Sequence, residues 1–187
     1  SFPTRRSSDL FISILKEALT SEIHLVASGQ GSQYILSDLF YKEPSEVYVN
    51  YKKDDSCKKW CNLTNDKNYI ILKFEDDINS CENMFYGLNN ITEIDLSNFD
   101  ASKVTTMNSM FRWCYNLKKI NFGKINTSSV VNMESLFHEC SNLTSIDLSN
   151  FDTSLVTTMN FMFSNCDQLN IIDASSFNTS NTIEMQD

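Results

Sequence analysis

Two of the six cysteines lie where oxidation is the expected chemistry. Cys57 and Cys61 occur in a polar, lysine-rich loop. In an exported chain, a close pair of this kind forms a disulfide. The sequence therefore predicts a Cys57–Cys61 disulfide, with Cys81 as a competing partner for either cysteine.

Three other cysteines recur at a fixed interval. Cys114, Cys140 and Cys166 are 26 residues apart, and Leu88 stands at the equivalent place one interval earlier. Thiolates so far apart, without histidine or carboxylate helpers, do not have the spacing of a zinc site. Because leucine replaces cysteine at the first place, we expect a small buried apolar group there, and free thiols rather than a metal column.

Polar residues of successive predicted strands form outward-facing columns that could bind a ligand. On this expected concave strand face the candidate ligand-binding residues are Glu93, Asp95, Lys119, Asn121, Asp147 and Asp173. A calcium ion bridging Asp147 and Asp173 is the sharper hypothesis, but such sites need six or more oxygen ligands and a tight glycine-containing loop, which this segment lacks. We expect no metal here, and the columns are either a solvated face or a surface that binds a macromolecule.

No residues have the spacing of a catalytic site. His24 lies on a predicted strand and His138 on the outer side of a predicted helix, and neither is near a serine or cysteine in a nucleophile motif. A glycine-rich phosphate-binding loop is also absent from the sequence. We therefore expect a protein without enzymatic activity and without a cofactor.

Five Asn-x-Ser/Thr triplets are candidate N-glycosylation sites if the chain passes through a eukaryotic secretory route. They begin at Asn62, Asn90, Asn126, Asn142 and Asn178. Asn90 and Asn142 occupy equivalent places before a predicted strand, where a glycan would not disturb the core.

These residues are positioned by four copies of a 26-residue unit laid end to end. The copies are residues 84–109, 110–135, 136–161 and 162–187. The same apolar places return in each copy, as in the series Ile94, Ile120, Ile146 and Ile172. A fixed period in the twenties is typical of a solenoid, whose units bury their apolar sides against one another.

Within one unit the periodicity changes once. Residues 145–149 alternate between apolar and polar, which predicts a short strand. Met107, Met110, Phe111 and Cys114 follow the i, i+3, i+4, i+7 pattern of a helix, and Thr106 is a residue type that caps helices. The predicted fold class is therefore α/β, a leucine-rich-repeat-type solenoid with a parallel sheet on one face and short helices on the other.

Residues 21–83 lack the repeat and are predicted to form a small β-rich capping domain. Runs rich in β-branched and aromatic residues predict strands at residues 23–27, 33–36, 46–50 and 69–74. The open end of a repeat array exposes its core, so this domain is expected to cover the first unit.

The repeat resembles the BspA-like leucine-rich repeat of bacterial and protist surface proteins. The resemblance is carried by residues 143–166, which read LTSIDLSNFDTSLVTTMNFMFSNC, and by the recurrence of that pattern over residues 84–187. It implies a cell-surface or secreted protein used in adhesion and recognition, generally without catalytic activity. The departures include Gly123-Lys124 in place of Ser-Asn, Leu88 in place of cysteine, and Ala174 and Thr182 at apolar places.

The two ends of the sequence carry separate expectations. Residues 1–10 look like a translated sequencing adapter and are excluded from fold reasoning. Residues 11–20 are expected to be either a signal-peptide remnant or a short amphipathic helix. The unit that ends at Asp187 has no capping segment after it, so the array is expected to be truncated.

Charge and composition exclude some classes of binding partner. Residues 84–187 hold five lysines and arginines against eleven aspartates and glutamates, within a chain of net charge −9, so nucleic acid is not an expected partner. No run approaches the length of a membrane span, so membrane attachment would need an anchor outside this segment. We expect an extracellular or cell-surface module that binds protein or glycan. The alternatives are a cell-coat protein that self-associates, an intracellular scaffold and an enzyme, and the oligomeric state stays open.

Overall fold

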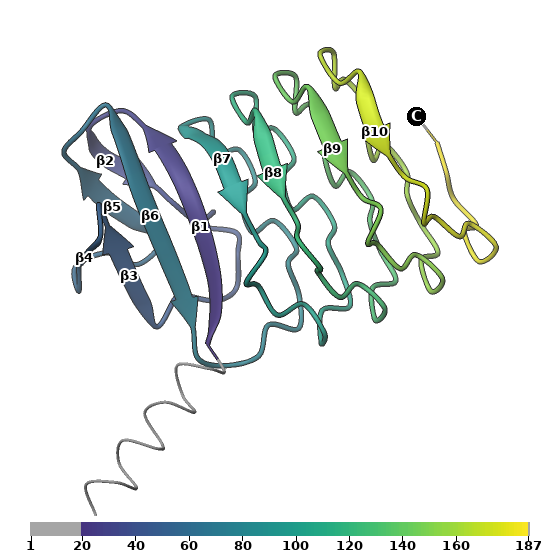
Figure 1. Cartoon of the computed structure of the whole chain (residues 1–187), viewed down its shortest axis with the longest axis horizontal. Coiled ribbons are helices and arrows are strands. Elements are labelled where there is room, and N and C mark those ends of the chain that lie inside the picture. Colours follow the sequence, from purple (N-terminus) through teal and green to yellow (C-terminus); the bar gives the residue numbers. More distant parts are fainter. Residues whose placement is uncertain (1–19, 187) are drawn as a thin grey trace, which may run out of the picture.

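The computed structural model describes residues 20–186 as ten strands joined by turns and loops (Figure 1). The expectations for residues 1–10 and for almost all of residues 11–20 lie outside this part of the chain. The strands are β1 (Ser21–Ser28), β2 (Gly31–Tyr34), β3 (Glu46–Val49), β4 (Lys52–Lys53), β5 (Trp60–Leu63), β6 (Lys67–Phe74), β7 (Ile91–Asp95), β8 (Lys119–Asn121), β9 (Ser145–Asp147) and β10 (Ile171–Asp173).

A mixed six-stranded sheet joins the N-terminal region to the repeats, in the order β4-β3-β6-β1-β7-β8. The long strand β1 pairs antiparallel with both β6 and β7, whereas β7 and β8 are parallel. Two further pairs, parallel β9-β10 and antiparallel β2-β5, form separate small sheets. The four runs of residues 21–83 that the sequence predicted as strands overlap β1, β2, β3 and β6, and the run at residues 145–149 overlaps β9, so those strand predictions are confirmed.

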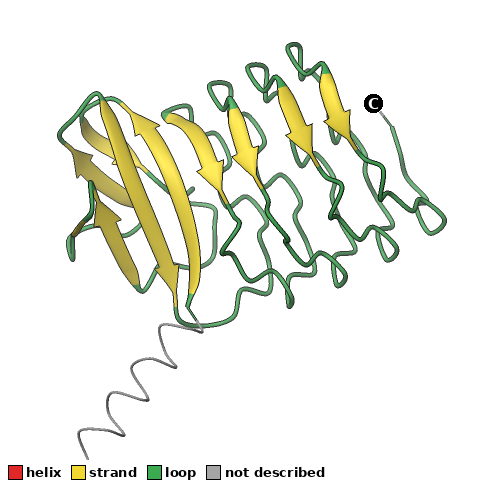
Figure 2. Ribbon diagram, in the orientation of Figure 1, coloured by secondary structure: helices red, strands yellow, loops and turns green. Residues whose placement is uncertain are grey.

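The predicted fold class, an α/β leucine-rich-repeat solenoid, is wrong. Residues 20–186 contain no helix, and Figure 2 shows only strands and loops there. The fold is β-rich, with mixed and parallel sheets. The inward stripe itself is correct, because Met107, Met110, Phe111 and Cys114 are all fully buried. They reach the core from two consecutive turns, which bring the same four places to one face as a helix would.

Left-handed residues explain why no helix forms. Two places in each unit have positive φ. The first place is occupied by Asn83, Ser109, Ser135 and Phe161, and the second by Gly87, Trp113, Glu139 and Asn165, with φ between 54° and 72°. A residue in this region interrupts an α-helix, because an α-helix needs negative φ throughout. The prediction failed because hydrophobic periodicity reports which side chains face inward and not the sign of φ.

Hydrogen bonds between units replace those of the missing helix. We call residues 81–88, 107–114, 133–140 and 159–166 the turn ladder. Within it, alternate N–H groups point in different directions: Met84 N–H donates to the Cys81 carbonyl in its own turn (3.1 Å), whereas Phe85 N–H donates to the Met110 carbonyl of the next unit (2.9 Å). Phe111 N–H and Phe137 N–H repeat the second bond, to Leu136 and Met162. Each unit therefore satisfies its backbone only beside its neighbour.

The core continues from unit to unit as a stack of phenylalanine rings. Phe85, Phe111, Phe137 and Phe163 lie almost parallel, with successive ring centroids 5.7, 5.6 and 5.5 Å apart. The cysteine column runs beside this stack. Each thiol donates to a phenylalanine carbonyl of the preceding unit, as Cys140 Sγ does to the Phe111 carbonyl at 3.1 Å. The buried thiols of Cys114 and Cys140 and the partly buried thiol of Cys166 therefore each have a hydrogen-bond partner. Burial raises the pKa of the Cys114 thiol to about 12, which makes it a poor nucleophile.

Gly123 marks a local exception in the array. Its φ is +55°, and a Cβ there would lie 2.8 Å from Ser97 Cα, whereas the equivalent residues Ser97, Ser149 and Ser175 do not have positive φ. It follows β8, which is not hydrogen-bonded to β9. Glycine at this place is therefore required by both backbone conformation and close packing.

We predict that Gly123→Ala lowers the free energy of unfolding by about 1–3 kcal/mol, because the new methyl group meets backbone atoms that cannot move aside. Ser149→Ala, at the equivalent place of the next unit, is the control and should change stability by less than about 0.5 kcal/mol. Urea denaturation of both variants checks this. Equal stability of the two variants would contradict the close packing of Gly123.

Candidate functional site

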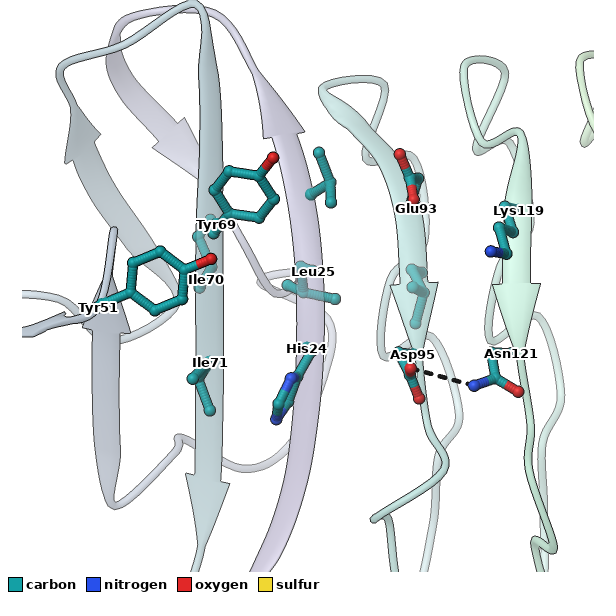
Figure 3. A pocket seen from close by; sticks show the side chains of 12 residues that line it. His24, Leu25, Tyr51, Tyr69, Ile70, Ile71, Glu93, Asp95, Lys119 and Asn121 are labelled. Atoms are coloured by element: carbon teal, nitrogen blue, oxygen red, sulfur yellow. Dashed lines mark hydrogen bonds between the residues drawn. The ribbon is translucent and has the colours of Figure 1, made fainter.

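The outward face of the six-stranded sheet contains a hollow of about 300 Å³ (Figure 3). Strand register places its residues in two rows that cross β6, β1, β7 and β8. The first row is Tyr69, Val26, Glu93 and Lys119, and the second is Ile71, His24, Asp95 and Asn121. Tyr51, from the turn between β3 and β4, adds a side chain at one end. We call this set the sheet hollow.

The hollow has an apolar end and a polar end. Tyr51 and Tyr69 stack at one end with ring centroids 5.9 Å apart and planes 23° from parallel. Val26 and Ile71 extend this apolar surface from the two tyrosines toward the repeats. Glu93 and Lys119 lie at the other end, on neighbouring strands (Figure 3). Apolar contact area with a few converging polar groups is the usual composition of a ligand site.

Tyr51 is held in a backbone conformation that its side chain does not favour. Asn50 (φ 51°) and Tyr51 (φ 66°) form the two-residue turn between β3 and β4. A turn with two left-handed residues favours Asn-Gly, and a bulky residue at the second place is strained. The ring that results is 77% exposed. Strain at an exposed aromatic residue is a reason to look for a function there.

Two of the polar side chains are already used by the fold. Asp95 Oδ1 accepts from Ser97 N–H (2.8 Å) and Asp95 Oδ2 accepts from Asn121 Nδ2 (3.1 Å). Burial raises the pKa of Asp95, but the hydrogen bonds from Ser97 and Asn121 outweigh it, so the pKa is lowered and the carboxylate stays ionised. Asn121 Oδ1 in turn accepts from Gly123 N–H. Asp95 and Asn121 therefore hold the strand ends and can offer a ligand only their remaining lone pairs.

Glu93 and Lys119 are freer. Glu93 has one ion-pair contact, with Lys67 at 3.9 Å, and among residues 20–186 Lys119 has no ion-pair partner. The Lys67 ammonium also lies 5.3 Å from the Tyr69 ring centroid. Glu93 and Lys119 are therefore the polar side chains of the hollow that are most available to a ligand.

An ion-pair row borders the hollow. Lys73 binds Glu22 and Lys53 binds Glu46, each at 2.7 Å. Burial raises the pKa of Glu22, but hydrogen bonds from Lys73 and His24 outweigh it, so its pKa is lowered. Because Glu22 also contacts His24 Nε2 at 3.3 Å, this row orients the His24 ring beside the hollow.

The structure brings together four of the six predicted ligand residues, Glu93, Asp95, Lys119 and Asn121. The other two lie side by side on β9 and β10, outside the hollow. Asp147 accepts from Ser149 N–H (2.9 Å) and Asp173 from Ser175 N–H (3.0 Å), so both carboxylates close the turn after a strand. Within residues 20–186, no group of three or more His, Cys, Asp or Glu side chains is arranged to hold a metal ion.

Sequence reasoning missed the aromatic and apolar half of the hollow: Tyr51, Tyr69, Val26, Ile71 and His24. Alternation along the predicted strands was enough to put Val26 and His24 on one face. It could not show that β1 would pair with β7, which brings that face beside the repeats. Of the two turn residues between β3 and β4, only Asn50 is of a type that favours a tight turn, and Tyr51 obscured that signal.

The predicted cysteine pair is bonded in the structure. Cys57 and Cys61 form a disulfide with their Cα atoms 4.8 Å apart. Cys81, the competing partner, is a free buried thiol, and burial raises its pKa.

The five candidate glycosylation asparagines differ in how their side chains are used. Asn90 Nδ2 donates to the Tyr34 carbonyl (2.9 Å) and Asn142 Nδ2 to the Tyr115 carbonyl (2.6 Å), so both amides already join neighbouring segments. The side-chain oxygens of Asn126 and Asn178 instead accept a backbone N–H, at 3.0 Å in each case, and Asn62 is exposed on β5.

A protein-family profile described as Mycoplasma protein of unknown function, DUF285, matches residues 79–187. The chain belongs to the DUF285 family. No leucine-rich-repeat family profile matches it. Searches of curated proteins and of solved structures found no match. The match covers the repeats of this DUF285 protein and leaves β1–β6, which supply half of the sheet hollow, outside it.

We predict that Tyr51→Gly is at least as stable as the parent chain. Glycine removes left-handed strain of about 1 kcal/mol, which offsets the loss of an exposed aromatic pair worth about 0.5 kcal/mol. Tyr51→Ala is the comparison, because it loses the same ring contact but keeps a Cβ at the left-handed position, and it should be the less stable variant. Thermal unfolding measures both. A Tyr51→Gly variant that is less stable than Tyr51→Ala would contradict the strained turn.

Proposed function

We propose that this protein is a BspA-like cell-surface or secreted recognition module that binds glycan through the sheet hollow, without catalysing a reaction. The observation that carries the proposal is the Tyr51–Tyr69 pair, which presents exposed aromatic faces beside polar side chains. The apolar face of a sugar ring packs on such aromatic faces, and its hydroxyl groups suit acceptors and donors like Glu93 and Lys119.

Three findings support a surface location. The DUF285 family is found in BspA-like surface proteins. The Cys57–Cys61 disulfide is typical of proteins outside the reducing cytosol. Of the other four cysteines, Cys81, Cys114 and Cys140 are buried and Cys166 is partly buried, so three of the four thiols are shielded from oxidants in solution. Within the described residues no helix is long and apolar enough to cross a membrane.

The same hollow does not favour catalysis. His24, the histidine that lines it, contacts Glu22 and belongs to the ion-pair row. Asp95 is held ionised by Ser97 and Asn121, so it does not carry a proton to donate near neutral pH. The arrangement suits binding of a ligand rather than acid–base chemistry.

A glycan array tests the proposal. The parent chain should bind a restricted set of glycans, and Tyr51→Gly and Tyr69→Ala should each weaken binding by at least about tenfold because each removes an aromatic contact from the apolar end of the hollow. Tyr34→Ala, which removes an exposed tyrosine outside the hollow, is the matched control and should bind as the parent does. Absence of glycan binding by the parent, or equal loss in all three variants, would reject the proposal.

A second candidate function is self-association into a cell coat. The fourth unit exposes Ile172, Ile183 and Met185, and Ile171 is exposed on the outward face of β10. Among residues 20–186, β10 pairs only with β9, and a strand edge without a partner can pair with another strand. The charges on this unit oppose association of two copies, because residues 162–186 carry Asp167, Asp173 and Glu184 and no lysine or arginine.

Sedimentation velocity at rising concentration distinguishes the two functions. A coat protein should form larger species that an Ile172→Lys substitution prevents, whereas a glycan-binding module should remain monomeric. Because like charges on the end face are screened by salt, any self-association should also increase with ionic strength. Monomers at high salt and high concentration would remove the second candidate.

A further inference from the structure

A second surface, outside the sheet hollow, is built by the turn ladder. Gly87 N–H donates to the Arg112 carbonyl and Trp113 N–H donates to the His138 carbonyl, each at 2.9 Å, so the turns of consecutive units lie side by side. Tyr86, Arg112 and His138 therefore follow one another in a row at equivalent places, and Trp113 stands next to that row.

The side chains of this row contact one another. The Tyr86 and Trp113 ring centroids are 5.0 Å apart, and the Arg112 guanidinium carbon lies 5.0 Å from the Trp113 ring centroid. His138 contacts Phe161 edge to face at 6.4 Å. Tyr115 and Phe161, both more than a third exposed, extend the aromatic surface. Arg112 thus lies on a platform of aromatic rings.

The repeat does not require these residues. The place of Arg112 is occupied by Tyr86 in the first unit and Ser164 in the fourth, and the place of Trp113 by Gly87 and Asn165. Trp113 also has φ +64°, in the region that glycine and asparagine adopt most easily. Tryptophan is therefore present at this place despite the backbone and not because of it.

Arg112 is incompletely satisfied. No carboxylate of residues 20–186 lies within ion-pair distance of its guanidinium, and its buried Nε has no hydrogen-bond partner. His138 Nδ1 is likewise buried without a partner. Glu139 is the nearby acid, and it contacts His138 Nε2 at 3.7 Å and the Tyr115 hydroxyl group rather than Arg112. An unpaired charged donor is unfavourable within a fold, and a bound carboxylate relieves that condition.

We propose that Tyr86, Arg112, Trp113, Tyr115 and His138 form a protein-binding surface that takes a partner segment in which a carboxylate is followed by an aromatic or aliphatic side chain. The carboxylate pairs with the Arg112 guanidinium, and the apolar side chain packs against Trp113 and Tyr86. Tryptophan, tyrosine and arginine are the residues that dominate binding at protein–protein interfaces. Charge complementarity selects an acidic partner, because Arg112 is the one arginine in residues 20–186 and no acidic side chain of those residues forms an ion pair with it.

The probes are polymers of defined chemistry. Polyglutamate offers carboxylates alone, a random glutamate–tyrosine copolymer offers carboxylates with aromatic side chains, and dextran sulfate offers an anionic glycan. Binding is measured by surface plasmon resonance. Trp113 fluorescence, in a Trp60→Phe background, locates the contact, since the chain has two tryptophans. The parent should bind the copolymer more tightly than polyglutamate, and the copolymer should shift Trp113 emission.

Each substitution introduces a residue that occurs at the equivalent position of another unit, except Arg112→Lys. Arg112→Ser and Trp113→Asn should each weaken copolymer binding by at least about tenfold, and Arg112→Lys should be intermediate because it keeps the charge but loses the planar fork. Lys118→Thr removes one positive charge of the same unit, three residues after Tyr115 in the sequence. It introduces the residue of the first and third units and should change binding less than about twofold.

Three results would overturn the proposal. Arg112→Ser could bind the copolymer as the parent does, or Lys118→Thr could lose as much affinity as Arg112→Ser, which would indicate non-specific charge attraction. Preference for dextran sulfate over the copolymer would assign the surface to an anionic glycan. Thermal unfolding of each variant accompanies the binding data, and Arg112→Lys keeps the test decisive if Arg112→Ser unfolds.

Discussion

Backbone hydrogen bonding between units is the constraint on which the rest of the structure depends. In the turn ladder every second N–H points out of its own turn, and the carbonyl that accepts it belongs to the next unit, as with Phe85 and Met110. Buried N–H groups have to be paired, so a unit cannot drift relative to its neighbour without breaking several bonds. The phenylalanine stack and the thiol–carbonyl bonds are consequences of this alignment, because equivalent side chains are brought within contact distance.

The same alignment places outward residues in rows and so creates both candidate surfaces. Glu93 and Lys119 adjoin because Ile94 and Ile120 are in register beneath them. Tyr86, Arg112 and Trp113 meet because their turns are bonded together. At each surface an aromatic residue, Tyr51 or Trp113, occupies a left-handed position where glycine or asparagine would be less strained. Two exposed aromatic residues held at such positions are difficult to explain by the needs of folding.

The sequence was sufficient for some features of the fold and not for others. Recurrence of Ile94 and its equivalents located the inward side chains, and β-branched runs located β1, β3 and β6. The helix prediction failed at Ser109 and Trp113, which have positive φ. Inward-facing residues spaced three and four apart occur in a helix, but they also occur in two successive turns that contain left-handed residues. Asp95 and Asp147 were predicted to bind a ligand because they occupy equivalent places in their units. Each carboxylate instead accepts a hydrogen bond from the backbone N–H two residues later in the chain, and comparing equivalent places does not reveal such a local bond. The hollow itself depends on β1 pairing with β7, which joins residues far apart in sequence.

The central claim is that the turn ladder is held by bonds between units. Scalar couplings across hydrogen bonds, measured by NMR on labelled protein, test it most directly. The account predicts couplings from the amide nitrogens of Phe85, Phe111 and Phe137 to the carbonyl carbons of Met110, Leu136 and Met162. Couplings from those amides to the carbonyl four residues earlier, as in an α-helix, would contradict it.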